Sequence, residues 1–346
     1  MNFSSNHVSL VTGASGFLGS WVVRKLVAQG RPVRALLRRS SSLRNLEGIP
    51  TQGYEIVRGD KTDRSSLVAA LAGCRWLFDC AVDVRTWLSQ EELDRTNVLG
   101  ARSLMSAALE GGVQRVVVCS AAGTIGRGRG GLATEDNEFD WWEDADPYIR
   151  SRVRSEREIQ DWVKKGLAVM IVNPAVVWGP GDSQPTPQGR MLIDFIAGRV
   201  PFSIPVTLCV ADVEDTAEAM IAAAERGRPG ARYLIGDENL RMKDLLRVVA
   251  EVAEVRPPRF ELPLPAAYGI AAACSLRNFF SGKPRVPFTL RTLRIARGMP
   301  PYDTSRSRTE LGYRPRPTRE VFARTIGWFR EHGYTGGPSA RTFHSN

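Results

Sequence analysis

The chain has 346 residues, of which 43% are hydrophobic and 24% charged, the composition of a globular protein with one large or two modest domains. Its formal net charge is +10, but the basic residues are scattered rather than gathered in one tail, which argues against nucleic-acid binding. The five cysteines form no CxxC pair and the three histidines lie near the chain ends, which disfavours a metal site, a disulfide framework and histidine catalysis, and favours a reducing, cytoplasmic location.

A glycine-rich stretch follows the first predicted strand. Residues 8–12 are apolar and β-branched, and apolar residues recur at helical spacing from Gly19 onward. Gly13, Gly16 and Gly19 therefore lie in a strand-to-helix turn, where they suit a tight turn, the approach of a phosphate and close helix–strand packing. Free N–H groups and the helix dipole favour a pyrophosphate at this helix start.

The second predicted strand, residues 33–37, is followed by arginines. In a dinucleotide-binding fold, an acid at the end of this strand binds the ribose 2′-hydroxyl of NAD. No acid occurs between Val33 and Leu46. The basic residues in this region are Arg34, Arg38, Arg39 and Arg44. This pattern favours the 2′-phosphate of NADP, while NAD, or a basic loop without a ligand, stays open.

Strands and helices alternate along the first half of the chain. Because the strands are nearly continuous apolar runs, they predict a parallel sheet covered by helices on both faces, an α/β fold of the Rossmann, doubly wound type. Further strands are expected at 54–60, 76–81, 113–120 and 168–173, and helices at 91–110, 148–165 and 213–226.

The chain is expected to divide near residue 178. Residues 1–178 would form the dinucleotide-binding domain, with 206–228 returning to it. Residues 179–335 would form a smaller substrate lobe and 336–346 a flexible tail. The longest apolar run, residues 264–275, is too short to span a membrane and is expected to be a core or surface helix.

A tyrosine and a cation share one face of the helix predicted at 148–165. Tyr148 and Arg152 are four residues apart, and the cation is expected to lower the pKa of the phenol toward use as a proton donor or acceptor. The alternative is that both are ordinary surface residues. Trp87, Trp141 and Trp142 are compatible with an aromatic or apolar substrate, and also with ordinary packing.

Several motifs together resemble those of the extended short-chain dehydrogenase/reductases, also called the NAD-dependent epimerase/dehydratase family. Within it the chain is most similar to hopanoid-associated sugar epimerases and dihydroflavonol-reductase-like proteins. The motifs are Thr12-Gly13-Ala14-Ser15-Gly16-Phe17-Leu18-Gly19, Gly59-Asp60, Thr96-Asn97-Val98-Leu99-Gly100, Tyr148-x-x-Ser151-Arg152, Asn173-Pro174 through Gly179-Pro180-Gly181-Asp182, and Glu310 to Pro315.

The resemblance implies roles for individual residues. It places Tyr148 and Arg152 at both the catalytic and the cofactor site, Arg38 on a 2′-phosphate, and Ala81 on the ribose. The remaining implied cofactor contacts are Gly13, Ser15, Gly16, Phe17, Leu18 and Gly19 on the pyrophosphate, Asp60 and Lys61 beside the adenine, and Pro174 to Val177 beside the nicotinamide.

Two positions depart from the family pattern of Ser, Tyr and Lys. The serine position is Ala121 and the lysine position is Arg152, so Thr124 or Ser120 would have to supply the missing hydroxyl. Arginine keeps the positive charge, although its planar fork is not equivalent to an ammonium group.

The sequence thus predicts an NADP-dependent oxidoreductase that reduces the carbonyl of a small, biosynthetic substrate, with Tyr148 as acid/base. The alternatives are a nucleotide-sugar epimerase or dehydratase, and a cofactor-binding sensor without catalysis. A homodimer built from helices 91–110 and 148–165 is implied by the resemblance.

Overall fold

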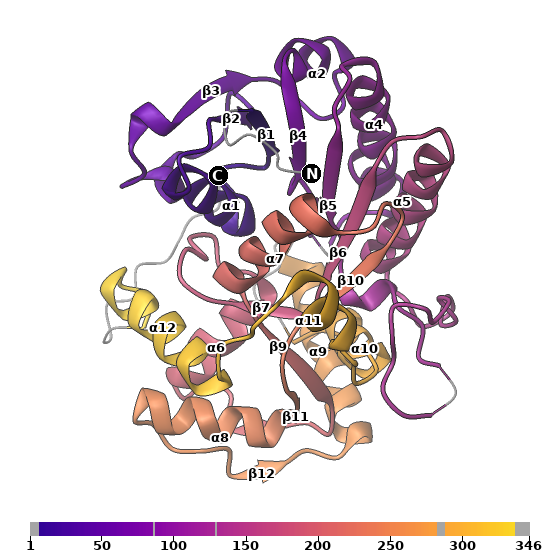
Figure 1. The fold of residues 1–346 in the computed structure, drawn as a ribbon. Helices are drawn as coiled ribbons and strands as arrows, with labels where there is room; N and C mark the ends of the chain where they lie inside the picture. Colours follow the sequence, from indigo (N-terminus) through magenta and orange to yellow (C-terminus); the bar gives the residue numbers. More distant parts are fainter. Residues whose placement is uncertain (1–6, 86, 129, 282–287, 336–346) are drawn as a thin grey trace.

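A seven-stranded parallel sheet forms the centre of the larger domain in the computed structural model, which describes residues 7–85, 87–128, 130–281 and 288–335 (Figure 1). The strand order is β10-β6-β5-β4-β1-β2-β3, so the order reverses between β1 and β4. This confirms the predicted doubly wound Rossmann-type fold, whose ligand crevice lies at that reversal. The strands are β1 (Val8–Thr12), β2 (Val33–Leu37), β3 (Tyr54–Arg58), β4 (Cys74–Asp79), β5 (Arg115–Cys119), β6 (Val169–Pro174) and β10 (Arg232–Ile235).

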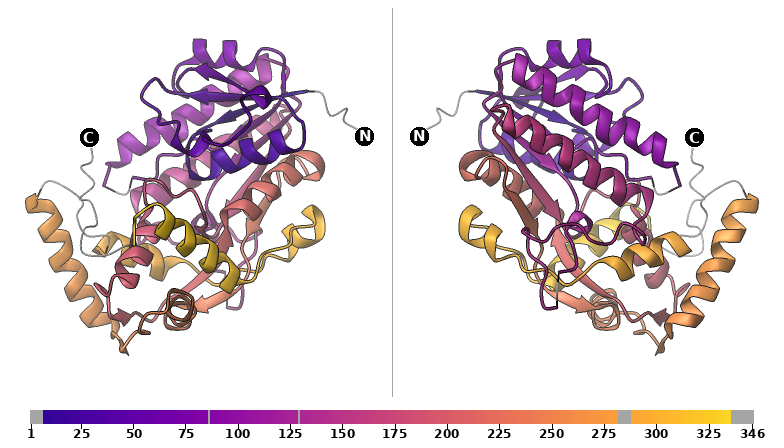
Figure 2. Two further views of the ribbon diagram at one scale, coloured as in Figure 1. Left: turned by 90° about the vertical axis from the view of Figure 1, so that its left-hand side faces the viewer. Right: turned by 90° about the vertical axis from the view of Figure 1, so that its right-hand side faces the viewer.

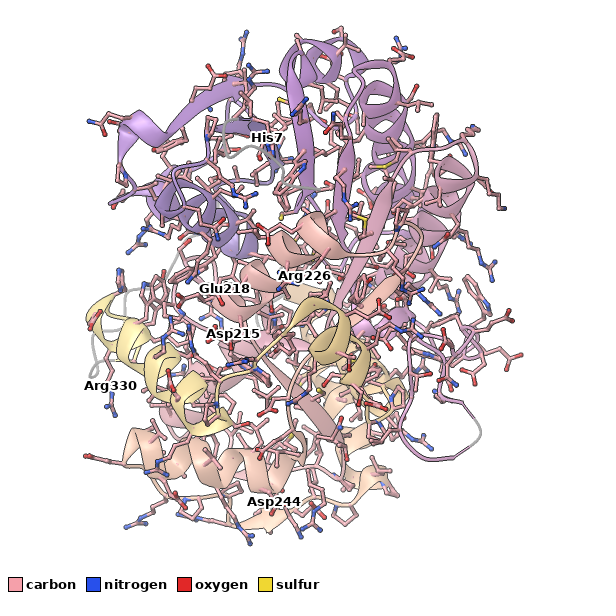
Figure 3. The ribbon with its side chains drawn as sticks, in the orientation of Figure 1. His7, Asp215, Glu218, Arg226, Asp244 and Arg330 are labelled. Atoms are coloured by element: carbon pink, nitrogen blue, oxygen red, sulfur yellow. The ribbon has the colours of Figure 1, made fainter. Side chains whose placement is uncertain are left out.

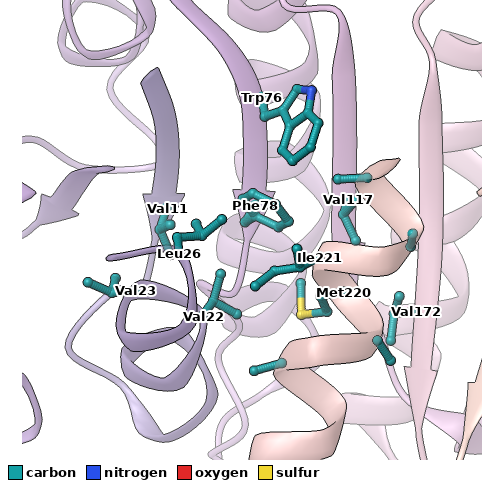
Figure 4. Close-up of a cluster of buried hydrophobic side chains, with 14 of the residues drawn as sticks. Val11, Val22, Val23, Leu26, Trp76, Phe78, Val117, Val172, Met220 and Ile221 are labelled. Atoms are coloured by element: carbon teal, nitrogen blue, oxygen red, sulfur yellow. The ribbon is translucent and has the colours of Figure 1, made fainter. Parts of the chain in front are cut away.

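Helices cover both faces of this sheet (Figure 2). One face packs on α1 (Phe17–Ala28) and α7 (Val213–Arg226), and Figure 4 shows Val11, Phe78 and Met220 meeting there. The other face packs on helices through Leu10, Leu77 and their neighbours. These helices are α2 (Arg64–Leu71), α4 (Gly100–Glu110) and α5 (Pro147–Lys164). Burial on both faces explains the near-continuous apolar strands.

The helix expected at 91–110 contains a π-helical turn. It consists of α3 (Gln90–Asp94), a π-helical segment (Arg95–Leu99) and α4, and it begins at a capping box between Ser89 and Glu92. The helix α5 begins where the Asp146 carboxylate accepts a hydrogen bond from the Ile149 N–H at 2.9 Å, with Pro147 in the first helical position. This start places Tyr148 in the first turn, close to the strand ends.

The second lobe has a three-stranded sheet and its own apolar core around Trp178, Leu245 and Phe322. Its sheet consists of β7 (Val176–Trp178), β9 (Thr207–Asp212) and β11 (Asn239–Arg241), beside the short pair β8 (Phe202–Ser203) and β12 (Phe260–Glu261). Its helices are α6 (Pro187–Ile196), α8 (Met242–Ala253), α9 (Leu264–Ser281), α10 (Leu290–Gly298) and α12 (Thr318–Glu331), whereas α11 (Ser305–Leu311) packs on α7 and β10 of the larger domain. None of the helices in the described part of the chain is long and apolar enough to cross a membrane.

Residues 206–228, which we expected to pack on the larger domain, are divided between the two lobes. Strand β9 belongs to the small sheet, whereas α7 packs on α1 in the larger domain. Ion pairs hold α7 to both sides: Glu218 lies 2.6 Å from Lys25 of α1, and Asp215 lies 3.3 Å from Arg316 of the second lobe. Figure 3 shows Asp215 and Glu218 on this central helix. The tail predicted at 336–346 lies outside the described residues.

Substituting Gly19 with alanine is expected to destabilise the protein. A Cβ at Gly19 would lie 2.1 Å from the Gly13 carbonyl oxygen, so the helix would have to move from the strand. Overpacking of this kind costs about 1–3 kcal/mol. Gly327→Ala in α12 is the matched control, because a Cβ there meets nothing within 4 Å and alanine favours helix. Urea unfolding should show a loss for Gly19→Ala and no loss for the control; equal stabilities would refute the packing argument.

Candidate active site

The glycine turn brings the end of β1 close to the end of β4. Gly13 has a φ of 61°, and a Cβ there would lie 2.7 Å from the Cys80 carbonyl oxygen. Gly16 is the N-cap of α1, no side chain caps this helix, and its first turn contains no acidic residue. Gly16 is exposed, and Ser15, Phe17 and Leu18 are partly exposed beside it. The turn therefore has the open backbone cradle and the helix start that a pyrophosphate requires.

The arginines after β2 have different surroundings. Burial raises the pKa of the Asp60 carboxyl, but hydrogen bonds from Thr62 and, to a smaller extent, the charge of the exposed Arg38 hold it below its usual range. Arg34 turns away and lies 2.6 Å from a Glu55 carboxylate oxygen. Arg39 is exposed, and Arg44 contacts the Tyr334 hydroxyl at 3.5 Å. Arg38 thus lies beside Asp60 at the adjacent ends of β2 and β3.

The structure corrects the role expected of the Lys61 side chain. Instead of flanking a ligand, its Nζ is buried 2.5 Å from Asp79 Oδ2 and 3.2 Å from the Ala81 carbonyl oxygen. Thr12 Oγ1 donates to the other carboxylate oxygen of Asp79 at 2.7 Å. Burial lowers the pKa of Lys61, the charge of Asp79 opposes this, and the charge of Arg152 lowers it further. The pair fixes the end of β4, where Ala81 is half-buried, and leaves only the Lys61 backbone to flank an adenine.

Arg152 is fully buried at the centre of the site. Its Nη2 donates to the Cys119 carbonyl oxygen at 2.6 Å, whereas Nε and Nη1 have no hydrogen-bond partner. Within the described ranges no carboxylate forms an ion pair with it. A buried charge with two unpaired N–H groups is costly unless a ligand supplies acceptors. The guanidinium therefore fits the ribose hydroxyls that the resemblance places there.

Tyr148 lies one turn before Arg152, half-buried and lining a cavity. Burial raises the pKa of its phenol to about 12, and the charge of Arg152 only partly opposes that effect. The expectation of a depressed pKa is therefore wrong for the ligand-free protein. The cause is that the phenol is removed from water by its neighbours, an effect that helical spacing does not reveal.

Thr124 and Ser120 belong to a buried polar network around Glu156. Thr124 Oγ1 lies 2.7 Å from Glu156 Oε1 and 3.0 Å from Asn173 Nδ2, and Ser120 Oγ donates to the same carboxylate oxygen. Thr124 is 1% exposed and does not line the cavity, and its hydroxyl is held within this network, so it does not replace the missing serine. Ala121 lines the cavity instead. Sequence reasoning missed Glu156, although its position four residues after Arg152 on the same helix was a usable signal.

An apolar cavity of about 330 Å³ lies between the strand ends and the second lobe. Tyr148, Ala121 and Pro174 line it from the larger domain, while Val177 does not. Residues of the second lobe that line it include Trp178, Met191, Phe195, Leu246, Phe288 and Leu293. The three tryptophans considered from the sequence lie elsewhere: Trp141 is buried against Phe139, Trp142 is near Arg157, and Trp87 is exposed. Ordinary packing accounts for the first two.

The strand order and the glycine turn define a protein with the Rossmann-type fold of dinucleotide-binding proteins. The chain also matches the sequence model of the NAD-dependent epimerase/dehydratase family over residues 9–236. It therefore belongs to this family, whose members are mostly NAD(P)-dependent oxidoreductases and epimerases.

Relatives of similar length support this assignment. "Sterol demethylase protein B" of Methylococcus capsulatus is 36% identical over 94% of this chain and 99% of its own. A "putative dihydroflavonol 4-reductase" of Synechocystis is 31% identical over 94% and 95%. Among solved structures, gox2253 is 36% identical with a TM-score of 0.83, covering 96% of this chain and 100% of its own. A nucleoside-diphosphate-sugar epimerase of Pseudomonas aeruginosa, 24% identical with a TM-score of 0.78 over 95% and 99%, shares the fold.

Removing the Lys61 cation is expected to leave the Asp79 carboxylate buried without its counter-charge. Lys61→Met should therefore lower the free energy of unfolding by roughly 3–5 kcal/mol. The double variant Lys61→Met/Asp79→Asn removes both charges and should recover part of that loss. Chemical unfolding of both variants tests this, and a single variant that costs less than the double one would contradict it.

Proposed function

We propose that this protein is an NADP(H)-dependent reductase of a ketone carried on an apolar ring or chain. The observation that supports this most is the position of Tyr148, which lines an apolar cavity one turn from the buried Arg152. A carbonyl group entering the cavity meets the phenol at the end of the cofactor crevice. Tyr148 and Arg152 are the residues to which we assign the chemistry.

The residues fit a nicotinamide dinucleotide. Gly13 and Gly19 leave no room for a Cβ, and Arg152 has two buried N–H groups without acceptors. When bound, the dinucleotide supplies the hydride for the carbonyl carbon. Tyr148 Oη then donates its proton to the carbonyl oxygen, and the positive charge of Arg152 stabilises the tyrosinate that remains. With Pro174, Ala121 shapes the wall beside the reacting carbon without donating a hydrogen bond.

The cavity favours an apolar substrate over a nucleotide sugar. Asp194 is the one charged side chain among the described residues that line it. A carboxylate repels a diphosphate, whereas phosphate sites are usually built from arginine, lysine or a helix start. The relatives' names agree with this, since they include a dihydroflavonol reductase and a ketoreductase of a farnesyl dihydroquinoline oxide in Stigmatella aurantiaca. An epimerase or dehydratase is the second candidate.

One observation favours the alternative that the protein is a sensor, which binds the cofactor but catalyses no reaction. Ala121 replaces the serine of the family pattern, and Thr124 is committed to Glu156. Losing one hydrogen-bond donor commonly lowers the rate by about 10²–10³-fold without abolishing the reaction. Retention of Tyr148 in the cavity wall therefore supports a slower enzyme rather than an inert site.

The homodimer stays a prediction. The helices that would form it carry ion pairs within the chain, because Arg102 lies 2.7 Å from Glu158 and Arg154 pairs with Asp94. These pairs neutralise part of the basic surface that would otherwise repel across a two-fold axis.

Substituting Arg38 with alanine should weaken NADPH binding by at least tenfold and leave NADH binding nearly unchanged. The reason is that we assign the exposed Arg38, at the end of β2, to the 2′-phosphate, which NADH lacks. Titration by intrinsic tryptophan fluorescence measures both constants. Arg75→Ala, another exposed arginine at the opposite end of the sheet, is the control. Tighter binding of NADH by the unaltered protein would reject the NADP assignment.

Tyr148→Phe is expected to lower ketone reduction by at least about 100-fold, the usual scale for losing a general acid, with little change in cofactor affinity. Tyr54→Phe, on the far strand β3, should have no effect. Because burial raises the pKa of the Tyr148 phenol to about 12, the proton donor stays protonated and reduction should change little between about pH 6 and 9.

The assay is NADPH oxidation with a panel of ketones on apolar ring systems. If the Tyr148→Phe variant turns over ketones as fast as the unaltered protein, Tyr148 is not the general acid. If the protein binds NADPH but no ketone of the panel oxidises it, the sensor hypothesis is favoured instead.

A further inference from the structure

The helix α9 is apolar on its exposed side. It spans 18 residues, Leu264–Ser281, and contains a single charged residue, Arg277. Its inner side packs Ala267 and Ala271 into the core of the second lobe. On the outer side Phe279 is 79% and Phe280 is 78% exposed. The same side also exposes Pro265, Ala266, Gly269, Ile270, Ala273 and Leu276.

No other segment that the structure describes covers this apolar surface. Figure 2 shows α9, in orange, at the outer edge of the second lobe and distant from the large sheet. A helix that is apolar all round is normally buried, and two adjacent phenylalanines that are almost fully exposed are unusual on a protein without a partner. We therefore expect that another molecule binds to this surface.

The segment that forms this surface carries charge of one sign only. From Leu262 to Tyr302 the sequence contains six basic residues and no carboxylate. Among the described ones, Arg277 on α9 and Arg294 and Arg297 on α10 are exposed, and Arg297 donates to the Tyr268 hydroxyl at 3.2 Å, which ties the two helices together. A second copy of the chain would bring these cations against one another without a carboxylate from this region to compensate them.

We propose that α9 and the exposed arginines of α10 form a docking surface for an anionic lipid bilayer. Phe279, Phe280 and Leu276 would enter the boundary between headgroups and acyl chains, while Arg277 and Arg294 contact lipid phosphates. An apolar face with basic residues beside it is the composition of helices that lie in a membrane interface.

The cavity lies directly behind this surface. Leu293 and Ile295 of α10 line it, and α10 packs on α9. Docking would therefore hold the cavity beside the bilayer, a source of apolar compounds. The docking itself rests on the α9 and α10 surface and not on the proposed reductase activity.

Flotation of the full-length protein with vesicles tests this inference. Vesicles that contain phosphatidylglycerol should carry the protein upward, and vesicles of phosphatidylcholine alone should carry at least tenfold less. Because both the aromatic side chains and the charges contribute, Phe279→Ser/Phe280→Ser should lose at least tenfold of the vesicle binding. Arg277→Gln/Arg294→Gln should lose binding mainly at low salt.

Val68→Ser/Leu109→Ser is the matched control. It removes two exposed apolar side chains from α2 and α4, at the opposite end of the molecule, and should bind vesicles as the unaltered protein does (Figure 1). The Phe279→Ser/Phe280→Ser variant should oxidise NADPH with a water-soluble ketone at the same rate as the unaltered protein. A failure of docking can therefore be distinguished from a failure of the proposed function.

Results of two kinds, from flotation and from light scattering, would overturn the inference. One is an unaltered protein that does not float with phosphatidylglycerol vesicles, or a Phe279→Ser/Phe280→Ser variant that floats equally well. The other is light scattering that shows a dimer for the unaltered protein and a monomer for this variant, because the face would then be covered by a second copy.

Discussion

A buried guanidinium without a carboxylate partner is the constraint on which the candidate site depends. Removing a charge from water costs several kcal/mol unless other groups compensate it. In the described structure Arg152 Nη2 donates a hydrogen bond to the Cys119 carbonyl oxygen, and Nε and Nη1 have no acceptor. The fold therefore maintains an unsatisfied cation at the carboxyl end of β5, at the same edge of the sheet as the dinucleotide crevice expected between β1 and β4.

The neighbouring buried charges are arranged so that they do not cancel this one. The carboxylate of Glu156 is held by Ser120, Thr124 and Asn173, and the carboxylate of Asp79 by Lys61 and Thr12. Each anion is thus satisfied locally. Arg152 stays available to a ligand and to the Tyr148 phenol, whose pKa it pulls down against the larger effect of burial. Partly unsatisfied polar groups are expected at a functional site and rare elsewhere.

The features of the fold and the site that the sequence predicts are those that depend on the spacing of residues close together in the chain. The Gly13, Gly16 and Gly19 pattern, the alternation of apolar strands with helices and the one-turn separation of Tyr148 from Arg152 each depend on nearby residues. The direction of a side chain depends on distant ones. Lys61 turns inward because Asp79, eighteen positions later in the chain, lies beneath it, and Thr124 turns toward Glu156 on another helix. The cavity wall, including Trp178, comes from segments of the second lobe that no single motif connects.

The most direct test of this account replaces Arg152 with methionine and measures two quantities on the same protein, the midpoint of thermal unfolding and the affinity for NADPH. If the guanidinium is an uncompensated buried charge kept for the ligand, its removal should leave the ligand-free protein at least as stable, because a methionine fills similar volume without a charge to desolvate. The same substitution should weaken NADPH binding by at least about tenfold. A variant that unfolds at a lower temperature yet binds NADPH as tightly as the unaltered protein would contradict the central claim.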